Sequence, residues 1–143
     1  MTFQNPSPAE IESLLRGARI IAVVGLSADS SRPSYGVAAA LQRFGYRVIP
    51  VTPTAPSVLG ERSVPDLDHL RDVLATDERV DLVDVFRRPE HVAAIVDDCI
   101  RLALPALWLQ DGVVDAVAAT RARDAGLRVV MDRCIFRDRA ALR

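Results

Sequence analysis

The sequence predicts an α/β protein, a Rossmann-like three-layer sandwich with a mainly parallel sheet. Short apolar runs that suit buried strands alternate along the chain with segments of helical periodicity. Glycine, proline or a small polar residue stands at most of the junctions between them. Strands that alternate with helices in this way form parallel sheets covered on both faces. A length of 143 residues suits one such unit, so we expect a single domain over residues 1–143.

Composition and charge narrow the class of protein. Half of the residues are hydrophobic and 26% are charged, as in ordinary soluble proteins. The net charge of −1 gives no general attraction to nucleic acid or to a membrane, and no apolar stretch approaches the ~18 residues of a membrane span. Two cysteines do not make a disulfide framework. We therefore expect a cytoplasmic protein that binds neither nucleic acid nor a membrane.

The first half of the chain begins with a helix that has a clear start signal. Ser7 at the N-cap, proline after it and Glu10 three positions on form a capping box, which predicts a helix ending near Gly17. The apolar run 20–24 then predicts a strand buried on both faces. After a polar loop, apolar residues at helical spacing predict a helix over 34–44, with a glycine directly after it.

A second strand and a long loop follow this helix. Residues 46–51 are apolar enough for a buried strand. The segment 52–65 contains prolines and a glycine, which predict a shaped loop with a short strand near 62–64. Asp66 is placed to cap a helix that continues through the leucines after it.

The second half repeats the alternation of strands and helices. The predicted strands are residues 80–86, 106–109 and 127–131. One predicted helix begins at Pro89, and a second one runs over 113–125. The helix after Pro89 is the clearest in the sequence because its apolar residues keep helical spacing. Those residues are Val92, Ile95, Val96, Cys99, Ile100 and Ala103. Cys99 is therefore expected in the core.

The end of the first strand has the features of a phosphate-binding turn. Gly25 stops the apolar run, and a loop rich in serine leads to a helix that starts near Ser34. Free backbone N–H groups and the positive end of the helix dipole face an anion in such a turn. Arg32 adds a full positive charge to the same loop. This corner is predicted to hold a nucleotide-type ligand.

Two further arginines lie where another strand ends. Ligands of parallel sheets bind beyond the carboxyl ends of the strands, here the segments 25–27, 51–53, 86–88 and 109–112. If the first strand is central, the first three of these segments converge, and Arg32, Arg87 and Arg88 surround a polyanion. Arg87 and Arg88 could instead be solvated. Cations are disfavoured at a helix start, however, which favours an anion role.

The usual dinucleotide and ATP motifs are absent. A dinucleotide fingerprint needs Gly-x-Gly-x-x-Gly and an acidic residue roughly 20 positions further on. After Gly25 the next glycine is Gly36, and no acidic residue stands between Arg43 and Gly60. No Gly-Lys-Ser/Thr of a P-loop occurs either. NAD binding of the ordinary kind is therefore disfavoured.

Several stretches, in order along the chain, closely resemble the stand-alone CoA-binding proteins. They are residues 21–27, 32–35, 48–51, 81–89, 107–110 and 130–134. That family is similar to the CoA-binding domain of the succinyl-CoA synthetase alpha subunit and of NDP-forming acyl-CoA synthetases. The resemblance spans residues 10–136 and implies a Rossmann-like fold with coenzyme A laid across the strand ends.

The resemblance also implies which residues bind the cofactor. The loop 25–35 would hold the CoA phosphates, Thr52 and Pro53 would border the adenosine end, and 86–88 would border the pantetheine or the phosphates. The implied binding residues are Gly25, Leu26, Ser27, Arg32, Pro33, Ser34, Tyr35, Thr52, Pro53, Phe86, Arg87, Arg88 and Gln110. Family members often carry a lysine just after the second-strand proline, where this chain has Thr54 and Ala55, so a ribose 3′-phosphate would need Arg32 or Arg62 instead.

Candidate catalytic and metal-binding residues are few. Neither His69 nor His91 has a nucleophile or metal ligand at a suggestive spacing, so no catalytic residue and no metal site is expected. Asp81 and Asp84 flank a buried strand and are expected to cap strand ends. Trp108 is expected to pack, and a mixed disulfide between Cys134 and CoA is conceivable.

Two functional hypotheses follow. The favoured one is a binding module without enzymatic activity, which captures CoA or an acyl-CoA as a carrier, a sensor or the partner of a separate enzyme. The alternative is an NAD(P)-binding redox sensor or small oxidoreductase, because arginine-rich loops would tolerate a 2′-phosphate. A homodimer or a partner enzyme is compatible with either.

Overall fold

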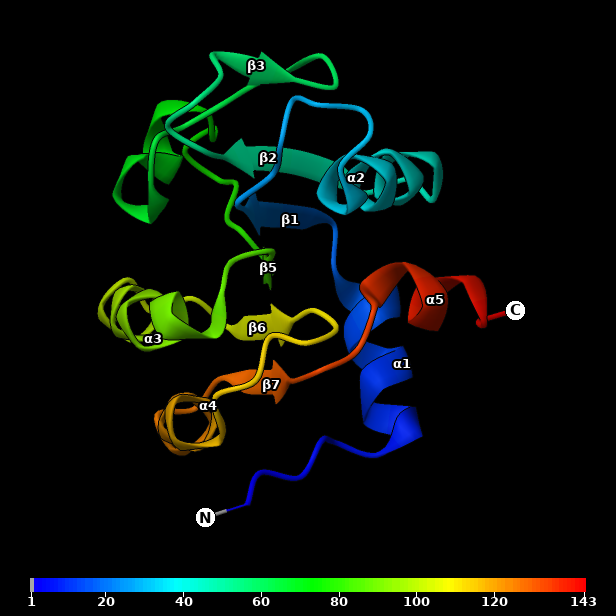
Figure 1. Ribbon diagram of the computed structural model, residues 1–143, viewed down its shortest axis with the longest axis vertical. Coiled ribbons are helices and arrows are strands. Elements are labelled where there is room, and N and C mark those ends of the chain that lie inside the picture. The colour runs from blue at the N-terminus through cyan, green and yellow to red at the C-terminus, as the bar shows by residue number, and fades with distance from the viewer. Residues whose placement is uncertain (1) are drawn as a thin grey trace.

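A five-stranded parallel sheet forms the centre of the molecule (Figure 1). The computed structural model describes residues 2–143. The strand order is β2-β1-β5-β6-β7, and every neighbouring pair is parallel. The strands are β1 (Ile20–Val24), β2 (Arg47–Val51), β5 (Leu82–Val85), β6 (Ala106–Leu109) and β7 (Arg128–Val130). The predicted Rossmann-like three-layer fold is confirmed.

Helices cover both faces of this sheet (Figure 1). Helices α1 (Pro8–Gly17), α2 (Pro33–Arg43) and α5 (Ile135–Ala140) pack on one face, and α3 (Val92–Arg101) and α4 (Ala116–Asp124) pack on the other. Side chains alternate along each strand, so the sheet separates two cores. In β1, Ile21 and Val23 face α1 and α2, whereas Ile20, Ala22 and Val24 face α3.

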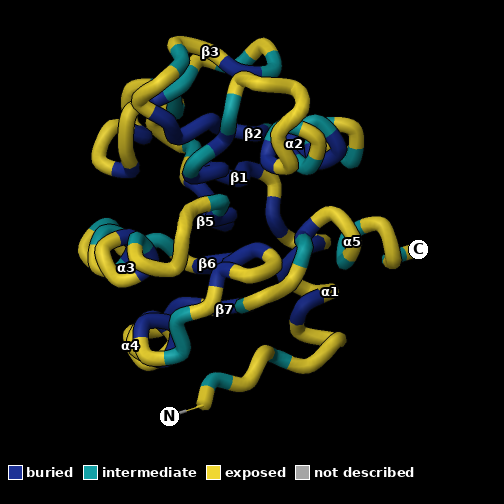
Figure 2. The backbone as a smooth tube through the Cα atoms, in the orientation of Figure 1, coloured by how far each residue is buried: buried dark blue, intermediate teal, exposed yellow. Residues whose placement is uncertain are grey.

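The strands are the most deeply buried part of the chain (Figure 2). Every residue of β1, β5 and β6 is buried, as expected for strands covered on both faces. The loops that leave the strands are mostly exposed (Figure 2). None of the helices in residues 2–143 is long and apolar enough to cross a membrane.

The start of α1 agrees with its sequence prediction. The Ser7 hydroxyl accepts a hydrogen bond from the Glu10 N–H (3.2 Å), and the Glu10 carboxylate accepts one from the Ser7 N–H (3.3 Å). This reciprocal capping box is complete. The N-terminal segment before it is also tied down, because the Asn5 side-chain amide pairs with both backbone groups of Met131 beyond β7.

The segment between β2 and β5 differs from its prediction. The loop contains a hairpin of β3 (Ser57–Val58) and β4 (Glu61–Arg62), and only Val64 pairs with the main sheet, at Val51. The helix after it is a short 3₁₀-helix, Leu67–Asp72. The Asp66 side chain does not cap this helix, because one of its oxygens lies 2.6 Å from His69 Nδ1.

The helices of the second half are shorter than predicted. A single 3₁₀-turn, Pro89–His91, precedes α3, and Ala103 lies beyond the end of α3 with a φ of +55°. Helix α4 starts at Ala116 rather than at residue 113, because the Asp115 carboxylate caps it by accepting from the Ala118 N–H (3.0 Å). The six-residue α5 was not predicted.

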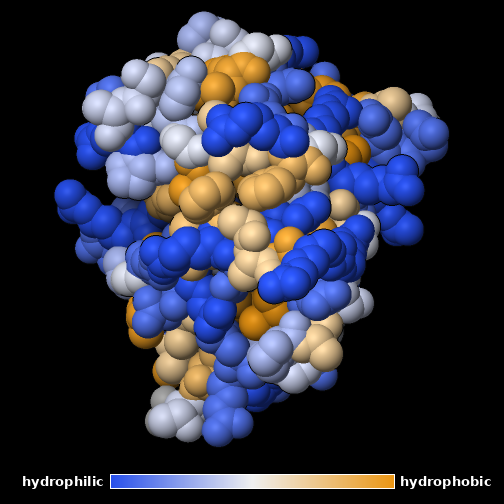
Figure 3. Space-filling view, turned by 90° about the vertical axis from the view of Figure 1, so that its right-hand side faces the viewer, coloured by the Kyte–Doolittle hydropathy of each residue, from blue (hydrophilic) through white to orange (hydrophobic). Residues whose placement is uncertain are grey.

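Helix α5 packs beside the end of α2 on one side of the molecule. The rings of Phe44 and Phe136 have centroids 6.3 Å apart, and the Arg139 guanidinium lies 4.8 Å from the centre of the Phe44 ring. Figure 3 faces this side and shows apolar surface in several areas between hydrophilic side chains.

The two aspartates that flank β5 have different roles. Asp81 caps the start of β1 as predicted, because its carboxylate accepts from the N–H groups of Arg19 (2.9 Å) and Ile20 (3.0 Å). The prediction that Asp84 caps a strand end is wrong. Asp84 is fully buried within β5, level with Val23 and Trp108, and neither carboxylate oxygen has a described hydrogen-bond partner. Burial raises the pKa of Asp84 well above its usual range.

Trp108 has a packing role, as predicted. Its side chain is fully buried, and its indole N–H donates to the Arg133 carbonyl (2.8 Å). This hydrogen bond satisfies the one polar group of the indole. It also fixes the segment that leads from β7 into α5.

Replacement of Asp84 by valine should change how stability depends on pH. The unfolded chain loses the Asp84 proton near pH 4, whereas the folded protein retains it because burial raises the pKa. The free energy of unfolding therefore falls above pH 4, by at most ~1.4 kcal/mol per pH unit, until the folded pKa is passed. Asp84→Val removes this loss and should gain stability relative to wild type between pH 5 and pH 8.

Urea unfolding of both proteins at these two pH values checks this expectation. Asp77→Val, at an exposed aspartate, is the matched control and should keep the pH dependence of the wild type. An Asp84→Val protein whose stability relative to wild type is the same at pH 5 and pH 8 would show that Asp84 is ionised in the fold.

Candidate functional site

The sheet changes its direction of growth between β1 and β5. Strand β2 lies on one side of β1, and β5, β6 and β7 follow on the other side. Loops that leave the carboxyl ends of two such strands diverge, and this is where ligands of parallel sheets bind. Two adjoining clefts lie at this place, and both are lined by Gly25, Ser27 and Arg87.

We name the two clefts by the strands beside them. The β2-side cleft has a volume of about 440 Å³ and includes Thr52, Pro53, Thr54, Asp66 and Asp98 in its lining. The β6-side cleft has a volume of about 760 Å³ and includes Arg32, Ser34, Phe86, Arg88, Gln110 and Arg137 in its lining. Together they form a continuous surface across the carboxyl ends of the strands.

Gly25 stands where the two clefts meet. Its φ is +84°, and a Cβ atom there would lie 2.4 Å from the Phe86 carbonyl oxygen and 2.9 Å from Arg87 Cδ. Backbone hydrogen bonds hold Gly25 and Phe86 in place. The Gly25 N–H donates to the Val51 carbonyl (3.0 Å), and the Phe86 N–H donates to the Val24 carbonyl (2.8 Å). The stem of Arg87 therefore lies directly over Gly25, in space that only glycine leaves open.

The loop after Gly25 is braced by its own polar side chains. The Ser27 N–H donates to the Ser34 hydroxyl (3.0 Å), and the Asp29 N–H donates to the Ser27 hydroxyl (3.0 Å). The N–H of Ser31 donates in turn to the Asp29 carboxylate (2.9 Å). Ser34 is buried and fixes the start of α2 against the loop. These bonds hold the turn in one shape in front of the helix.

The N-terminus of α2 differs from those of α1 and α4. Helices α1 and α4 begin with a side-chain cap, whereas α2 has neither a side-chain cap nor an acidic residue in its first turn. Arg32 occupies its N-cap position. The end of α2 that borders the β6-side cleft is therefore positive by its dipole and by the charge of Arg32.

Four arginines line the β6-side cleft, and two of them have a described acidic partner. Arg88 lies 3.8 Å from Glu90, and Arg137 pairs with Asp111. Within residues 2–143, no carboxylate lies within ion-pair distance of Arg32 or Arg87. Arg137 could not be predicted as a lining residue because it lies on α5, which is too short to show a periodic pattern.

The β2-side cleft has a different lining, with hydroxyl and carboxylate groups and one arginine. Thr52 is buried, and its hydroxyl lies 2.9 Å from that of Thr54. Asp66 and Asp98 line the cleft with Arg87, and each also has a partner outside it: Asp66 lies 2.6 Å from His69 Nδ1, and Asp98 accepts from the Arg101 guanidinium (2.7 Å). Arg62, one of the two arginines expected to replace the family lysine, lines neither cleft. Hydroxyl and carboxylate groups suit a ligand that donates hydrogen bonds, such as a sugar or an amine.

The structure brings together nearly all of the residues that the sequence predicted. The predicted residues that line one or both clefts are Gly25, Leu26, Ser27, Arg32, Pro33, Ser34, Thr52, Pro53, Phe86, Arg87, Arg88 and Gln110. Tyr35 lines neither cleft and packs against the core below α2. Leu26 is buried and can offer only its backbone. The buried Gln110 uses its Oε1 to accept from the Ile135 N–H (3.2 Å), which anchors α5.

The two cysteines lie in different surroundings. Cys99 is buried in the core, as predicted, and burial raises the pKa of its thiol to about 12. Cys134 is half-buried and lines the β6-side cleft. In residues 2–143, no group of three or more His, Cys, Asp or Glu side chains is arranged to hold a metal ion.

Replacement of Gly25 by alanine should destabilise the protein more than the same change at another glycine with positive φ. Alanine at φ +84° costs about 1–2 kcal/mol, and its Cβ would also displace the Phe86 carbonyl. Gly60→Ala is the matched control, because its φ is +79° but no atom lies within 4 Å of the added Cβ. Urea unfolding should show at least about 2 kcal/mol more loss for Gly25→Ala. Equal losses would contradict the close contact.

Comparison with known proteins finds similarity over most of the chain. Residues 19–139 match the model of a family described as a CoA binding domain. The uncharacterized protein YneT of Bacillus subtilis (strain 168) is 39% identical over 133 residues, which cover 93% of this chain and 94% of that protein. A solved structure from Thermus thermophilus is 33% identical with a TM-score of 0.85, over 94% of this chain and 98% of that one.

A larger enzyme contains a domain of the same fold. A structure of a dinucleotide-forming acetyl-coenzyme A synthetase from Ca. Korarchaeum cryptofilum matches with a TM-score of 0.65 and 23% identity, over 83% of this chain but 27% of that one. At this identity the likeness shows the fold alone. The family model and the Bacillus relative cover most of the chain, and this protein belongs to the CoA-binding domain family.

Proposed function

We propose that this protein binds coenzyme A or an acyl-CoA across the carboxyl edge of its sheet, without catalytic machinery of its own. The observation that carries the proposal is the Gly25–Arg87 corner. It joins two clefts of different charge character at the switch point of a CoA-binding domain. Coenzyme A has a polyanionic centre between an uncharged pantetheine arm and a nucleoside, which calls for a site of this mixed kind.

The phosphates of the cofactor fit the β6-side cleft near Arg87. Arg32, Arg87 and the uncapped start of α2 supply positive charge to one short stretch of this surface. A guanidinium binds phosphate oxygens through two parallel hydrogen bonds, and a helix N-terminus adds backbone N–H donors. Arg88 extends the positive surface, although its side chain is 84% exposed and points towards Glu90.

The adenosine fits the β2-side cleft, and the pantetheine arm then runs towards β6. The end of the second strand commonly faces the ribose in Rossmann-like folds. Here that place holds the Thr52 and Thr54 hydroxyls with two carboxylates nearby. Phe86 and Gln110 line the β6-side cleft, where the pantetheine arm would lie on the other side of Arg87. The Asp66 and Asp98 carboxylates favour ribose hydroxyls over a phosphate, so a 3′-phosphate would have to turn towards Arg87 or Arg32.

A binding role agrees with the size of the relatives. The Bacillus relative is covered over 94% of its length, so this domain makes up nearly all of that protein. The acetyl-coenzyme A synthetase contains a domain of this fold within a chain of which only 27% is matched. We infer that this protein presents or senses the cofactor while another protein performs the chemistry.

Thermal unfolding with separate ligands tests the proposed function. The expected stabilisation follows RT ln(1 + [L]/Kd), which gives about 2.7 kcal/mol at a ligand concentration of 100 Kd. Coenzyme A or acetyl-CoA should raise the melting temperature, whereas NADP and ATP should not. A shift with NADP and none with coenzyme A would favour the redox-sensor alternative. Mass spectrometry of ligand released from freshly purified protein would then identify the natural occupant.

Replacement of Arg87 by alanine should weaken coenzyme A binding by about tenfold, which corresponds to ~1.4 kcal/mol. The charge-assisted contact with phosphate is lost, whereas uncharged pantetheine has no phosphate to contact. Calorimetric titration should therefore show an unchanged affinity for pantetheine. Arg43→Ala, at an exposed arginine of α2 outside both clefts, is the control. Equal loss for both ligands would show that Arg87 does not contact phosphate.

A further inference from the structure

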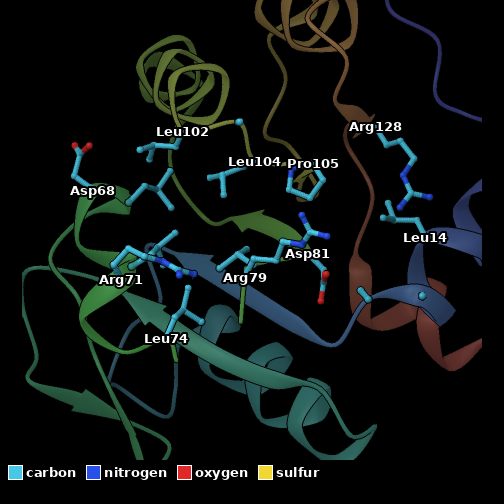
Figure 4. Close-up of a pocket in the computed structure, with 16 residues that line it drawn as sticks. Leu14, Asp68, Arg71, Leu74, Arg79, Asp81, Leu102, Leu104, Pro105 and Arg128 are labelled. Atoms are coloured by element: carbon cyan, nitrogen blue, oxygen red, sulfur yellow. The ribbon is translucent and has the colours of Figure 1, made fainter. Parts of the chain in front are cut away.

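A further cavity lies at the opposite, amino edge of the sheet (Figure 4). Its volume is about 680 Å³, within the range of small-molecule sites. Its walls come from the end of α1, the 3₁₀-helix Leu67–Asp72, the loop before β5, the connection from α3 to β6, and the start of β7. From the side chains that line these walls, we propose that the cavity binds a small monoanionic organic molecule with an apolar body.

The apolar part of the cavity is built from leucines and a proline. Leu102, Leu104 and Pro105 come from the connection after α3, and Leu74 lies on the opposite wall (Figure 4). Leu74, Leu102 and Leu104 are each only partly buried, so their side chains retain apolar surface towards the cavity. An apolar ligand body that covers this surface would be stabilised by roughly 25 cal/mol per Å².

Three arginines from three separate segments supply positive charge. Arg71 belongs to the 3₁₀-helix, Arg79 to the loop before β5, and Arg128 to the start of β7 (Figure 4). The Arg71 side chain donates to the Glu78 carbonyl. Among residues 2–143, no carboxylate lies within ion-pair distance of any of the three. The guanidinium groups of Arg79 and Arg128 also donate to no described residue.

The two aspartates of the cavity are already engaged. Asp68 accepts hydrogen bonds from the Arg101 guanidinium at 2.6 and 3.3 Å. Asp81 accepts from the backbone N–H groups at the start of β1. Three arginines and two aspartates leave one net positive charge in the lining. A monoanion such as a carboxylate would balance this charge, and a polyphosphate would exceed it.

This cavity is separate from the proposed cofactor site. The strands lie between the two, and no residue lines both this cavity and either of the carboxyl-edge clefts apart from Leu67. A ligand here would therefore not compete with coenzyme A for the same surface. The inference goes beyond the proposed function and does not depend on it.

Titration with octanoate, followed by backbone amide NMR of the full chain, tests the proposal. Octanoate should shift the amides of Arg71, Leu104 and their neighbours. Acetate has the charge without the apolar body, and 1-octanol has the body without the charge, so each should bind at least tenfold more weakly. The double variant Arg79→Gln/Arg128→Gln should weaken octanoate by about tenfold and leave 1-octanol unchanged. Arg43→Gln is the control and should bind octanoate as the wild type does.

Three results would overturn the proposal. The first is the absence of shifts around Arg71 and Leu104 at millimolar octanoate. The second is an equal loss of octanoate binding in Arg43→Gln, which would reflect only the net charge of the protein. The third is displacement of octanoate by coenzyme A, which would make this cavity part of the other site. An amide spectrum of each variant without ligand shows that it is folded.

Discussion

The candidate site depends on one close contact. Gly25 lies against the Phe86 carbonyl and the side-chain stem of Arg87. This contact joins the loop after β1 to the loop after β5, the two strands that flank the switch point of the sheet. Without a Cβ at residue 25, the Phe86 carbonyl and the stem of Arg87 can lie over the end of β1. A guanidinium is thereby held between the two clefts, close to the start of α2.

The distribution of charge gives this corner its chemical character. Arginines gather on the β6 side and carboxylates on the β2 side, while the net charge of the protein is only −1. Attraction to an anion is therefore local, and its strength depends on how far the ligand removes these exposed side chains from water. The loop between Gly25 and Ser34 keeps its shape through its own hydrogen bonds, so little ordering is needed when a ligand binds.

Much of the fold could be predicted from the sequence because strand burial and helix periodicity are local patterns. The apolar run at β1 and the capping box of Ser7 and Glu10 each correspond to an observed element. Short elements could not be predicted in the same way. Helix α5 has six residues and one buried side chain, too few for a periodic signal. The true start of α4 depends on Asp115, whose capping role becomes visible only in three dimensions.

The residues of the site were predicted better than their contacts. The strand-end rule identified most of the lining, but it could not show that Tyr35 packs against the core or that Gln110 anchors α5. Asp84 was misplaced because a buried strand looks the same in sequence whether a polar residue caps its end or lies inside it. The close approach of Arg87 to Gly25 joins two loops that are far apart in the chain, and no local sequence pattern predicts such a contact.

Backbone amide NMR with stepwise additions of coenzyme A would locate the bound cofactor on the sheet. We expect saturable shifts centred on Gly25, Ser27 and Arg87, with smaller shifts at Thr52 and none at Arg79 or Arg128. Shifts centred on the amino edge of the sheet, or no shifts at millimolar coenzyme A, would contradict this expectation.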